Sequence, residues 1–405
     1  MKKFSFIFCV SLICSFAVLT SCKDKDSAEE DLFGVSDITK LNDYSYSDLS
    51  VEKQKEKLQG DANGFLSELQ GLKTNDGVKV LATFNALLEI DAPQPGFLRA
   101  SSQDVIYHIA DFYGKYTWNA SKHVWDYAAS TSKEAEFSFP VENKTGKIVA
   151  SAVSSSLYYE DETWYYDEDS KKDVDVNLSI ELPKEVHGKI YLGTAEVGSL
   201  HAVSDIKSLT TFPSLSELTY VLGEYTFTSK VAKATPSIAK STLKNGSKVL
   251  IDAEANMSGN VDFFANDTIN PGQMNGNVVI NLQNTLAFAG IVDFTKYMVV
   301  MNEIDEAYYD DRDKYGREKA EENYYKADAK AFNDYINLFL VASKDKAKIA
   351  TLKSKAKLNE RYWGTVPVLV FKDNTEIEAE VFFSSGFDTF LKNLNDFVNS
   401  FLSGK

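Results

Sequence analysis

Strict alternation of apolar and polar residues characterises the middle of the chain. In the stretch DVDVNLSIELP at 173–183, valine, leucine or isoleucine occupies every second position from 174 to 182, between polar residues. The stretch EAEFSFPV at 134–141 has the same period of two. Since side chains of a strand point alternately to its two faces, this pattern predicts strands with one buried and one solvated face, as in antiparallel sheets. Turn-forming sequences separate more such segments, so we expect an antiparallel β body over 93–300.

Helical patterns flank this β body. Over 46–92, apolar residues recur at three- and four-residue spacings, which predicts an N-terminal helical segment that Pro93 and Pro95 end. Residues 301–360 are rich in lysine, glutamate, alanine and tyrosine, a helix-like composition. The last segment, 361–405, predicts a β-hairpin followed by an amphipathic C-terminal helix.

These elements predict an α+β fold in one compact unit over 46–405. We expect a predominantly antiparallel β meander, in the form of a curved sheet or half-barrel, with N-terminal and C-terminal helices packed on it. This architecture resembles the half-barrel of periplasmic lipoprotein carriers. The resemblance concerns the fold class alone.

The N-terminus has the properties of a secretory signal. Two lysines precede an almost wholly apolar run over 4–19, which is short for a membrane-spanning helix. The run ends in a motif that resembles a bacterial lipobox: Leu19, Thr20, Ser21 and Cys22. The resemblance implies that residues 1–21 are a lipoprotein signal peptide and that Cys22 carries the acyl chains of a membrane anchor. The alternative is an ordinary secretory signal in which Cys22 merely lies near the cleavage site.

Charged residues directly follow Cys22. Residues 22–45 predict a flexible acidic tether, because charged and polar residues without periodicity follow Cys22. The lysines and carboxylates over 23–31 resemble the lipoprotein export signal of Bacteroidota. That resemblance implies a lipid-anchored protein on the outer face of the outer membrane. An orientation toward the periplasm is the alternative.

Charge and motif content exclude several function classes. The formal net charge of −16 opposes binding to nucleic acid, and the chain has no basic stripe with interleaved aromatic residues. The sequence contains no H-E-x-x-H zinc motif, no P-loop and no G-x-S-x-G elbow. We therefore expect no cofactor, no metal ligand and no catalytic residue, and a protein that is not an enzyme. A zinc site would need its ligands to converge from separate strands, because none of the four histidines are spaced i, i+4.

Aromatic residues crowd around an acidic stretch at 157–173. Their flat apolar faces and the neighbouring carboxylates suit a glycan, and we expect a hairpin with Glu160, Asp161 and Glu162 at its tip. The alternative is that the rings only stabilise the hairpin by cross-strand pairing. The candidate ligand-binding residues are Tyr158, Tyr159, Trp164, Tyr165 and Tyr166.

Three functions remain open from the sequence. The first is a non-enzymatic, lipid-anchored envelope protein that binds a glycan or an apolar molecule on its β-sheet. The second is a structural adhesin or fimbria-like surface component, which an exposed edge strand would favour. The third is a hydrolase, which converging histidines or carboxylates with perturbed pKa would favour.

Overall fold

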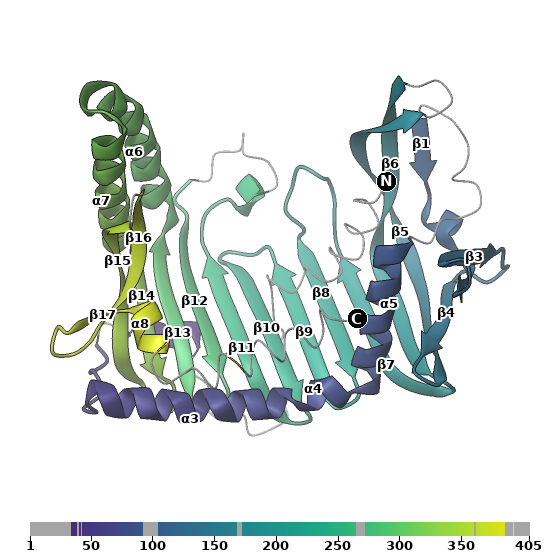
Figure 1. Ribbon diagram of the computed structural model, residues 1–405, viewed down its shortest axis with the longest axis horizontal. Coiled ribbons are helices and arrows are strands. Elements are labelled where there is room, and N and C mark those ends of the chain that lie inside the picture. Colours follow the sequence, from purple (N-terminus) through teal and green to yellow (C-terminus); the bar gives the residue numbers. More distant parts are fainter. Residues whose placement is uncertain are drawn as a thin grey trace.

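The structure is a computed structural model that describes residues 34–38, 40–41, 43–91, 104–167, 172–264, 272–359, 362–384 and 392. It confirms the α+β fold class, because seventeen strands form one open, mostly antiparallel sheet with a few helices on it (Figure 1). The predicted signal peptide over 1–21 and the lipobox-like motif with Cys22 lie outside the described residues.

The strands are β1 (Asp104–Tyr107), β2 (Gly114–Asn119), β3 (Val124–Ala128), β4 (Ala135–Val141), β5 (Lys144–Asp167), β6 (Lys172–Leu192), β7 (Ala195–Ser204), β8 (Leu215–Leu222), β9 (Tyr225–Ala232), β10 (Ser237–Asn245), β11 (Lys248–Met257), β12 (Asn275–Leu282), β13 (Leu286–Asp293), β14 (Ile336–Ala342), β15 (Ala347–Asn359), β16 (Tyr362–Val370) and β17 (Glu376–Glu378). The helices are α2 (Val35–Ile38), α3 (Val51–Leu69), α4 (Gly71–Thr74), α5 (Asp76–Ile90), α6 (Phe294–Tyr315), α7 (Arg317–Tyr335) and α8 (Ala379–Ser384), with short 3-10 turns η2 (Ile109–Phe112) and η3 (Val261–Phe264).

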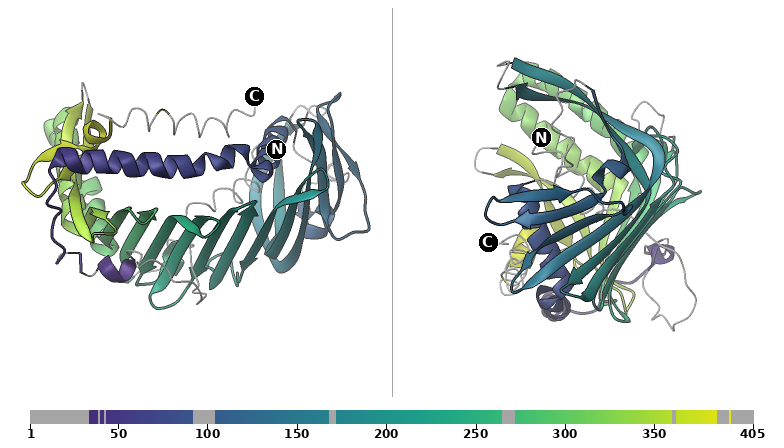
Figure 2. Two further views of the ribbon diagram at one scale, coloured as in Figure 1. Left: turned by 90° about the horizontal axis from the view of Figure 1, so that it is seen from below. Right: turned by 90° about the vertical axis from the view of Figure 1, so that its right-hand side faces the viewer.

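The sheet is a meander, as the sequence predicts. From β4 to β17 each strand pairs antiparallel with the next one along the chain. Two pairs are parallel, β1 with β6 and β2 with β4. Figure 2 shows the sheet bent into a trough, with α3 on the concave side and α2 on the convex side.

Helix α3 runs along the concave side across many strands (Figures 1 and 2). The Ser50 side chain caps it by accepting a hydrogen bond from the backbone N–H of Lys53. Its buried Leu58 packs with residues of β14–β16, and its buried Leu66 and Leu69 pack with Tyr225 and Leu250. The apolar stripe of this helix therefore joins strands that lie far apart in the sheet.

Replacing either of two glycines in the N-terminal helices by alanine is expected to change the stability of the protein in opposite directions. A Cβ at Gly60 would meet nothing within 4 Å, so Gly60→Ala is expected to stabilise the protein by about 0.5–1 kcal/mol through helix propensity. A Cβ at Gly77 would lie 2.8 Å from the carbonyl oxygen of Val197, so Gly77→Ala is expected to destabilise it by about 1–3 kcal/mol. Guanidinium unfolding of both variants measures the two signs. A stabilised Gly77→Ala protein would contradict the close approach of α5 to β7.

The acidic tether is shorter than the sequence predicts. Val35, Ile38 and Leu41 are buried against Val279 and other residues on the convex face of β12–β14. The prediction of a flexible segment up to residue 45 is therefore wrong from Val35 onward. The few apolar residues there are enough to hold this short segment on the sheet, because each is almost wholly removed from water.

The predicted helical segment over 301–360 is half wrong. Helices α6 and α7 cover 294–335, but residues 336–342 and 347–359 form β14 and β15. In β15, lysines at 353, 355 and 357 alternate with Ser354, Ala356 and Leu358, which is a period of two. The lysine- and alanine-rich composition favours a helix, whereas this spacing and the pairing with β14 and β16 favour a strand.

The predicted C-terminal hairpin forms, but its second arm is shorter than predicted. Strand β16 pairs with β17 over three residues, and from Ala379 the chain forms α8 instead of continuing as a strand. The helix buries Phe382 against Phe371, which a strand beside β16 would not require. The predicted amphipathic helix beyond it lies outside the described residues, apart from Lys392.

Helices α6 and α7 form a hairpin at one end of the sheet (Figure 1). Gly316 joins them with a φ of 84°, a left-handed conformation that glycine adopts readily. No helix among the described residues combines the length and the apolar composition that crossing a membrane requires.

Candidate functional site

The concave face of the trough is the candidate site, and the strand register defines it. One continuous row of paired residues crosses ten strands from β5 to β14 on this face. We call it the concave row: Ala152, Val186, Ala202, Leu218, Ser229, Ser241, Ala253, Ile280, Phe288 and Leu340. Leu340 packs with Leu58 of α3, which identifies the face, because α3 lies on the concave side (Figure 2).

This face carries no formal charge over its central part. Side chains alternate along each strand, so the positions two residues before and after the concave row share its face. At these positions of β7–β13 the residues are aliphatic, aromatic, serine or glycine. An uncharged surface of this kind offers apolar contact but few groups that hydrogen-bond a polar ligand.

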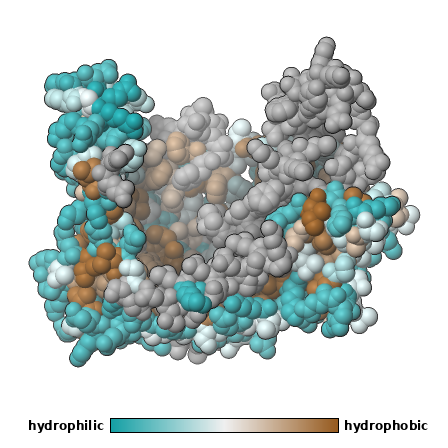
Figure 3. All heavy atoms as spheres, viewed as in Figure 1, coloured by the Kyte–Doolittle hydropathy of each residue, from teal (hydrophilic) through white to brown (hydrophobic). Residues whose placement is uncertain are grey.

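Large apolar side chains of the concave row remain in contact with solvent. Ile280 is 39% exposed, and its cross-strand partner Phe288 is 43% exposed. Figure 3 shows the molecule hollowed on this side, with apolar residues inside the hollow. Exposed, contiguous apolar surface is unfavourable in water and is typical of binding sites.

The convex face of the same strands has the opposite character. Lys230 forms an ion pair with Glu217 at 2.6 Å, and Lys240 lies 3.4 Å from Asp252. Thr242 donates a hydrogen bond to Asp252 at 2.9 Å. The sheet is therefore amphipathic in its centre, with charged residues outside and apolar residues inside the trough.

The predicted aromatic site does not form as expected. Tyr158 and Tyr159 lie on β5, paired with Glu181 and Ile180, so adjacent ring positions face opposite sides of the sheet. Trp164, Tyr165 and Tyr166 also belong to β5, but their side chains lie outside the described part. The expected acidic tip is wrong, because Glu160, Asp161 and Glu162 are paired residues inside β5. Aromatic residues and threonine around them favour a continued strand over a turn.

Tyr158 belongs to a polar cluster. Its hydroxyl lies 3.0 Å from Nδ1 of His108, and that nitrogen is 3.8 Å from a carboxylate oxygen of Glu181. Glu181 also accepts hydrogen bonds from the Ser154 hydroxyl and, at 2.8 Å, from the backbone N–H of Ile109. The serine donates to the carboxylate and not to the imidazole, so this cluster lacks the serine–histidine pairing of a hydrolase triad.

The Glu181 carboxylate predicts a loss of stability in acid. The hydrogen bond from Ser154 lowers the pKa of Glu181, and the Ile109 N–H and His108 lower it further against the effect of burial. A lowered folded-state pKa gives stability above the unfolded-state pKa that is lost as pH falls through the folded-state value. Glu181→Gln is expected to destabilise the protein at about pH 7 and to make little difference at about pH 3. Guanidinium unfolding at both pH values measures this, and an equal loss at both would contradict it.

The sequence predicted a glycan or an apolar ligand on the sheet but did not identify the concave row. The signal lies in stretches such as SIAKSTLKN at 237–245, where lysines occupy one face only. Relating such stretches to one another requires the register, which their sequences do not contain. No family model, no curated protein and no solved structure matches this chain.

Proposed function

We propose that this chain is a lipid-anchored protein of the cell envelope that binds an apolar ligand of the acyl-chain class on its concave face. It holds the ligand without catalysing a reaction. The main observation behind this proposal is the uncharged concave face, with Ile280 and Phe288 exposed at its centre. Burying such side chains against an acyl chain releases water from both surfaces, at about 25 cal/mol for each Å² of apolar area.

The concave row favours an apolar ligand over a glycan. Its polar members are Ser229 and Ser241, and both are serines whose hydroxyls lie 3.4 Å apart. A glycan needs many hydrogen-bond partners, and leaving its hydroxyls unpaired in an apolar trough would cost more than the contact contributes. The structural alternative keeps some support, because β5 pairs with β4 only over 144–150 and from residue 151 to 167 pairs only with β6 among the described strands. The uncharged trough is the observation that favours the apolar ligand over it.

The proposal of a membrane anchor is based on the resemblance of residues 19–22 to a lipobox. The chain between Cys22 and Gly34 spans at most about 40 Å when fully extended. It joins α2 on the convex face, so the tether is attached to the body on the side opposite the trough.

Site-specific photocrosslinking in cells tests the ligand. The photoreactive residue p-benzoylphenylalanine replaces Ile280 on the concave face or, as the matched control, Ile238, which is 37% exposed on the convex face. We expect lipid adducts at position 280 and none at position 238, read by mass spectrometry of the full chain. Saccharide adducts at 280 would indicate a glycan, and a protein adduct would indicate an adhesin-like assembly. Either result would refute the apolar ligand.

Protease treatment of intact cells tests the location. A non-permeant protease is expected to cleave the wild-type protein on the outer surface. A variant with alanine at each of residues 23–26 is expected to stay protected, because it lacks the charged residues that resemble the export signal. Protection of both proteins in the membrane fraction would indicate a periplasm-facing protein instead.

A further inference from the structure

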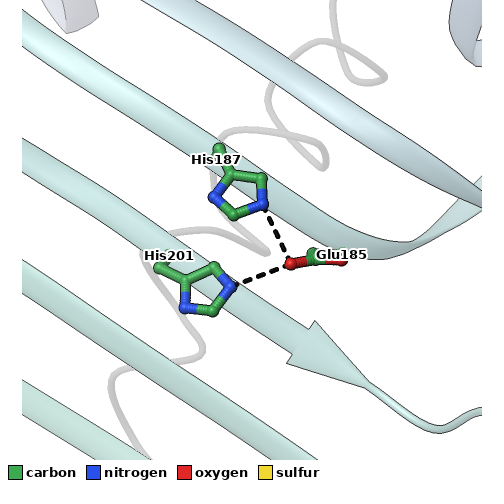
Figure 4. Close-up of side chains that lie close together, drawn as sticks. All are labelled: Glu185, His187 and His201. Carbon is green, nitrogen blue, oxygen red and sulfur yellow. Dashed lines mark hydrogen bonds and ion pairs between the residues drawn. The ribbon is translucent and has the colours of Figure 1, made fainter.

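Two histidines and a glutamate converge on the convex face, outside the site proposed above. Glu185 and His187 are two residues apart on β6, so they share a face of the sheet. His187 pairs directly with His201 of β7. Figure 4 shows both imidazoles directed toward the Glu185 carboxylate.

A register shift creates this arrangement. Near the turn, Tyr191 pairs with Glu196, whereas beyond the shift Ile190 pairs with Gly198, so Val197 is an extra residue on β7. Without the shift, His187 would pair with residue 200, and His201 would point to the concave face. The bulge therefore places both histidines on the same face.

The three ligand atoms are already close together. Nε2 of His187 lies 2.9 Å from Oε1 of Glu185, and Nε2 of His201 lies 3.1 Å from the same oxygen. The two rings are stacked, with centroids 4.6 Å apart and planes 13° from parallel. All three candidate ligand atoms lie within 4.8 Å of one another, the one such group of three among the described residues.

We propose that Glu185, His187 and His201 form a binding site for a divalent transition-metal ion, with zinc as the probe. In a tetrahedral zinc site with ligand atoms about 2.0–2.1 Å from the ion, neighbouring ligand atoms lie about 3.3 Å apart. The nitrogen–oxygen distances of 2.9 and 3.1 Å are within a few tenths of an ångström of that value. Convergence of both nitrogens needs a rotation of the rings about χ2, and their half-exposed side chains leave room for it.

The ligand set selects the class of metal. Imidazole nitrogens suit zinc, copper and nickel, whereas calcium and magnesium prefer oxygen ligands. The carboxylate supplies the negative charge, and hydrogen bonds from His201 and His187 lower the pKa of Glu185. Three protein ligands on an open face leave a coordination position for water or a second molecule. Metal binding at this place is independent of an apolar ligand on the opposite face.

Equilibrium dialysis of the full chain against zinc chloride tests the site. We expect His201→Asn and Glu185→Gln each to weaken zinc binding at least about 100-fold, since even second-shell losses cost 10–100-fold. Cobalt(II) replaces zinc in a second measurement, and its visible absorption is expected in the wild type but not in either variant. Far-ultraviolet circular dichroism shows that the variants are folded.

His123→Asn is the matched control. His123 lies in the turn between β2 and β3 with a φ of 56°, which asparagine tolerates, and it is remote in sequence from the proposed ligands. It is expected to bind zinc like the wild type. Equal zinc uptake by the wild type and His201→Asn would overturn the site. An equal loss in His123→Asn would overturn it too, because binding would then not be specific to these three residues.

Discussion

Phe288→Asp is expected to remove the apolar ligand from the concave face. The change places a carboxylate at the centre of the concave row, beside Ile280. An acyl chain seated there would desolvate the charge without pairing it, which costs several kcal/mol. Because about 1.4 kcal/mol is a factor of ten in affinity, we expect occupancy to fall at least about tenfold. A diazirine- and alkyne-bearing fatty acid, fed to cells and crosslinked by light, measures this as adducts on β12–β13 peptides.

Ile238→Asp is the control for this experiment. Its exposure of 37% is close to that of Ile280, but its side chain lies on the convex face. It is expected to keep the wild-type amount of adduct on β12–β13. Equal adduct formation in Phe288→Asp and the wild type, with both proteins folded, would show that the concave row is not the binding surface.

Leu58→Ala is expected to destabilise the whole protein by about 2–5 kcal/mol. Leu58 is buried where α3 meets Leu340, Ile349 and Leu369. Alanine leaves a cavity at this contact, and α3 holds together strands that otherwise meet only through their neighbours. The free energy of unfolding in guanidinium measures the loss.

Leu49→Ala is the matched control for that loss. Leu49 immediately precedes the cap of α3 and is exposed, so its truncation is expected to change the free energy of unfolding by less than about 0.5 kcal/mol. A loss in Leu58→Ala no larger than in Leu49→Ala would contradict the packing of α3 on the sheet.

The two faces of the sheet serve separate proposed roles. The concave face is apolar and suits an acyl chain, whereas the convex face carries ion pairs, α2 and the proposed metal site. The bulge at Val197 matters for both sites, because it determines which residues of β7 face the concave side and which face the convex side. A variant that loses metal binding but keeps ligand binding, or the reverse, would show that the two proposed sites function separately.

Much of the fold could be predicted where the pattern is local. The alternation over 173–183 lies within β6, and the three-four spacing over 51–69 matches α3. Prediction failed where the local composition favoured one structure and the contacts in the folded protein favoured another. Residues 347–359 have helix-forming lysines and alanines, yet they form β15 because β14 and β16 pair with them on both sides. The sequence predicts Val35 and Ile38 as part of a flexible tether, but in the fold they are buried against an apolar surface of the sheet.

The sequence by itself determined the α+β class, the meander and the charge, because periodicity and turn residues act between neighbours in the chain. The tertiary structure decided which alternating positions become the concave row and which meet on the convex face. Sheet curvature, the position of α3 and one extra residue at Val197 make that choice. A shift of one residue moves every later side chain of a strand to the other face. The register that a strand adopts depends on its pairing with other strands, which its own sequence does not contain.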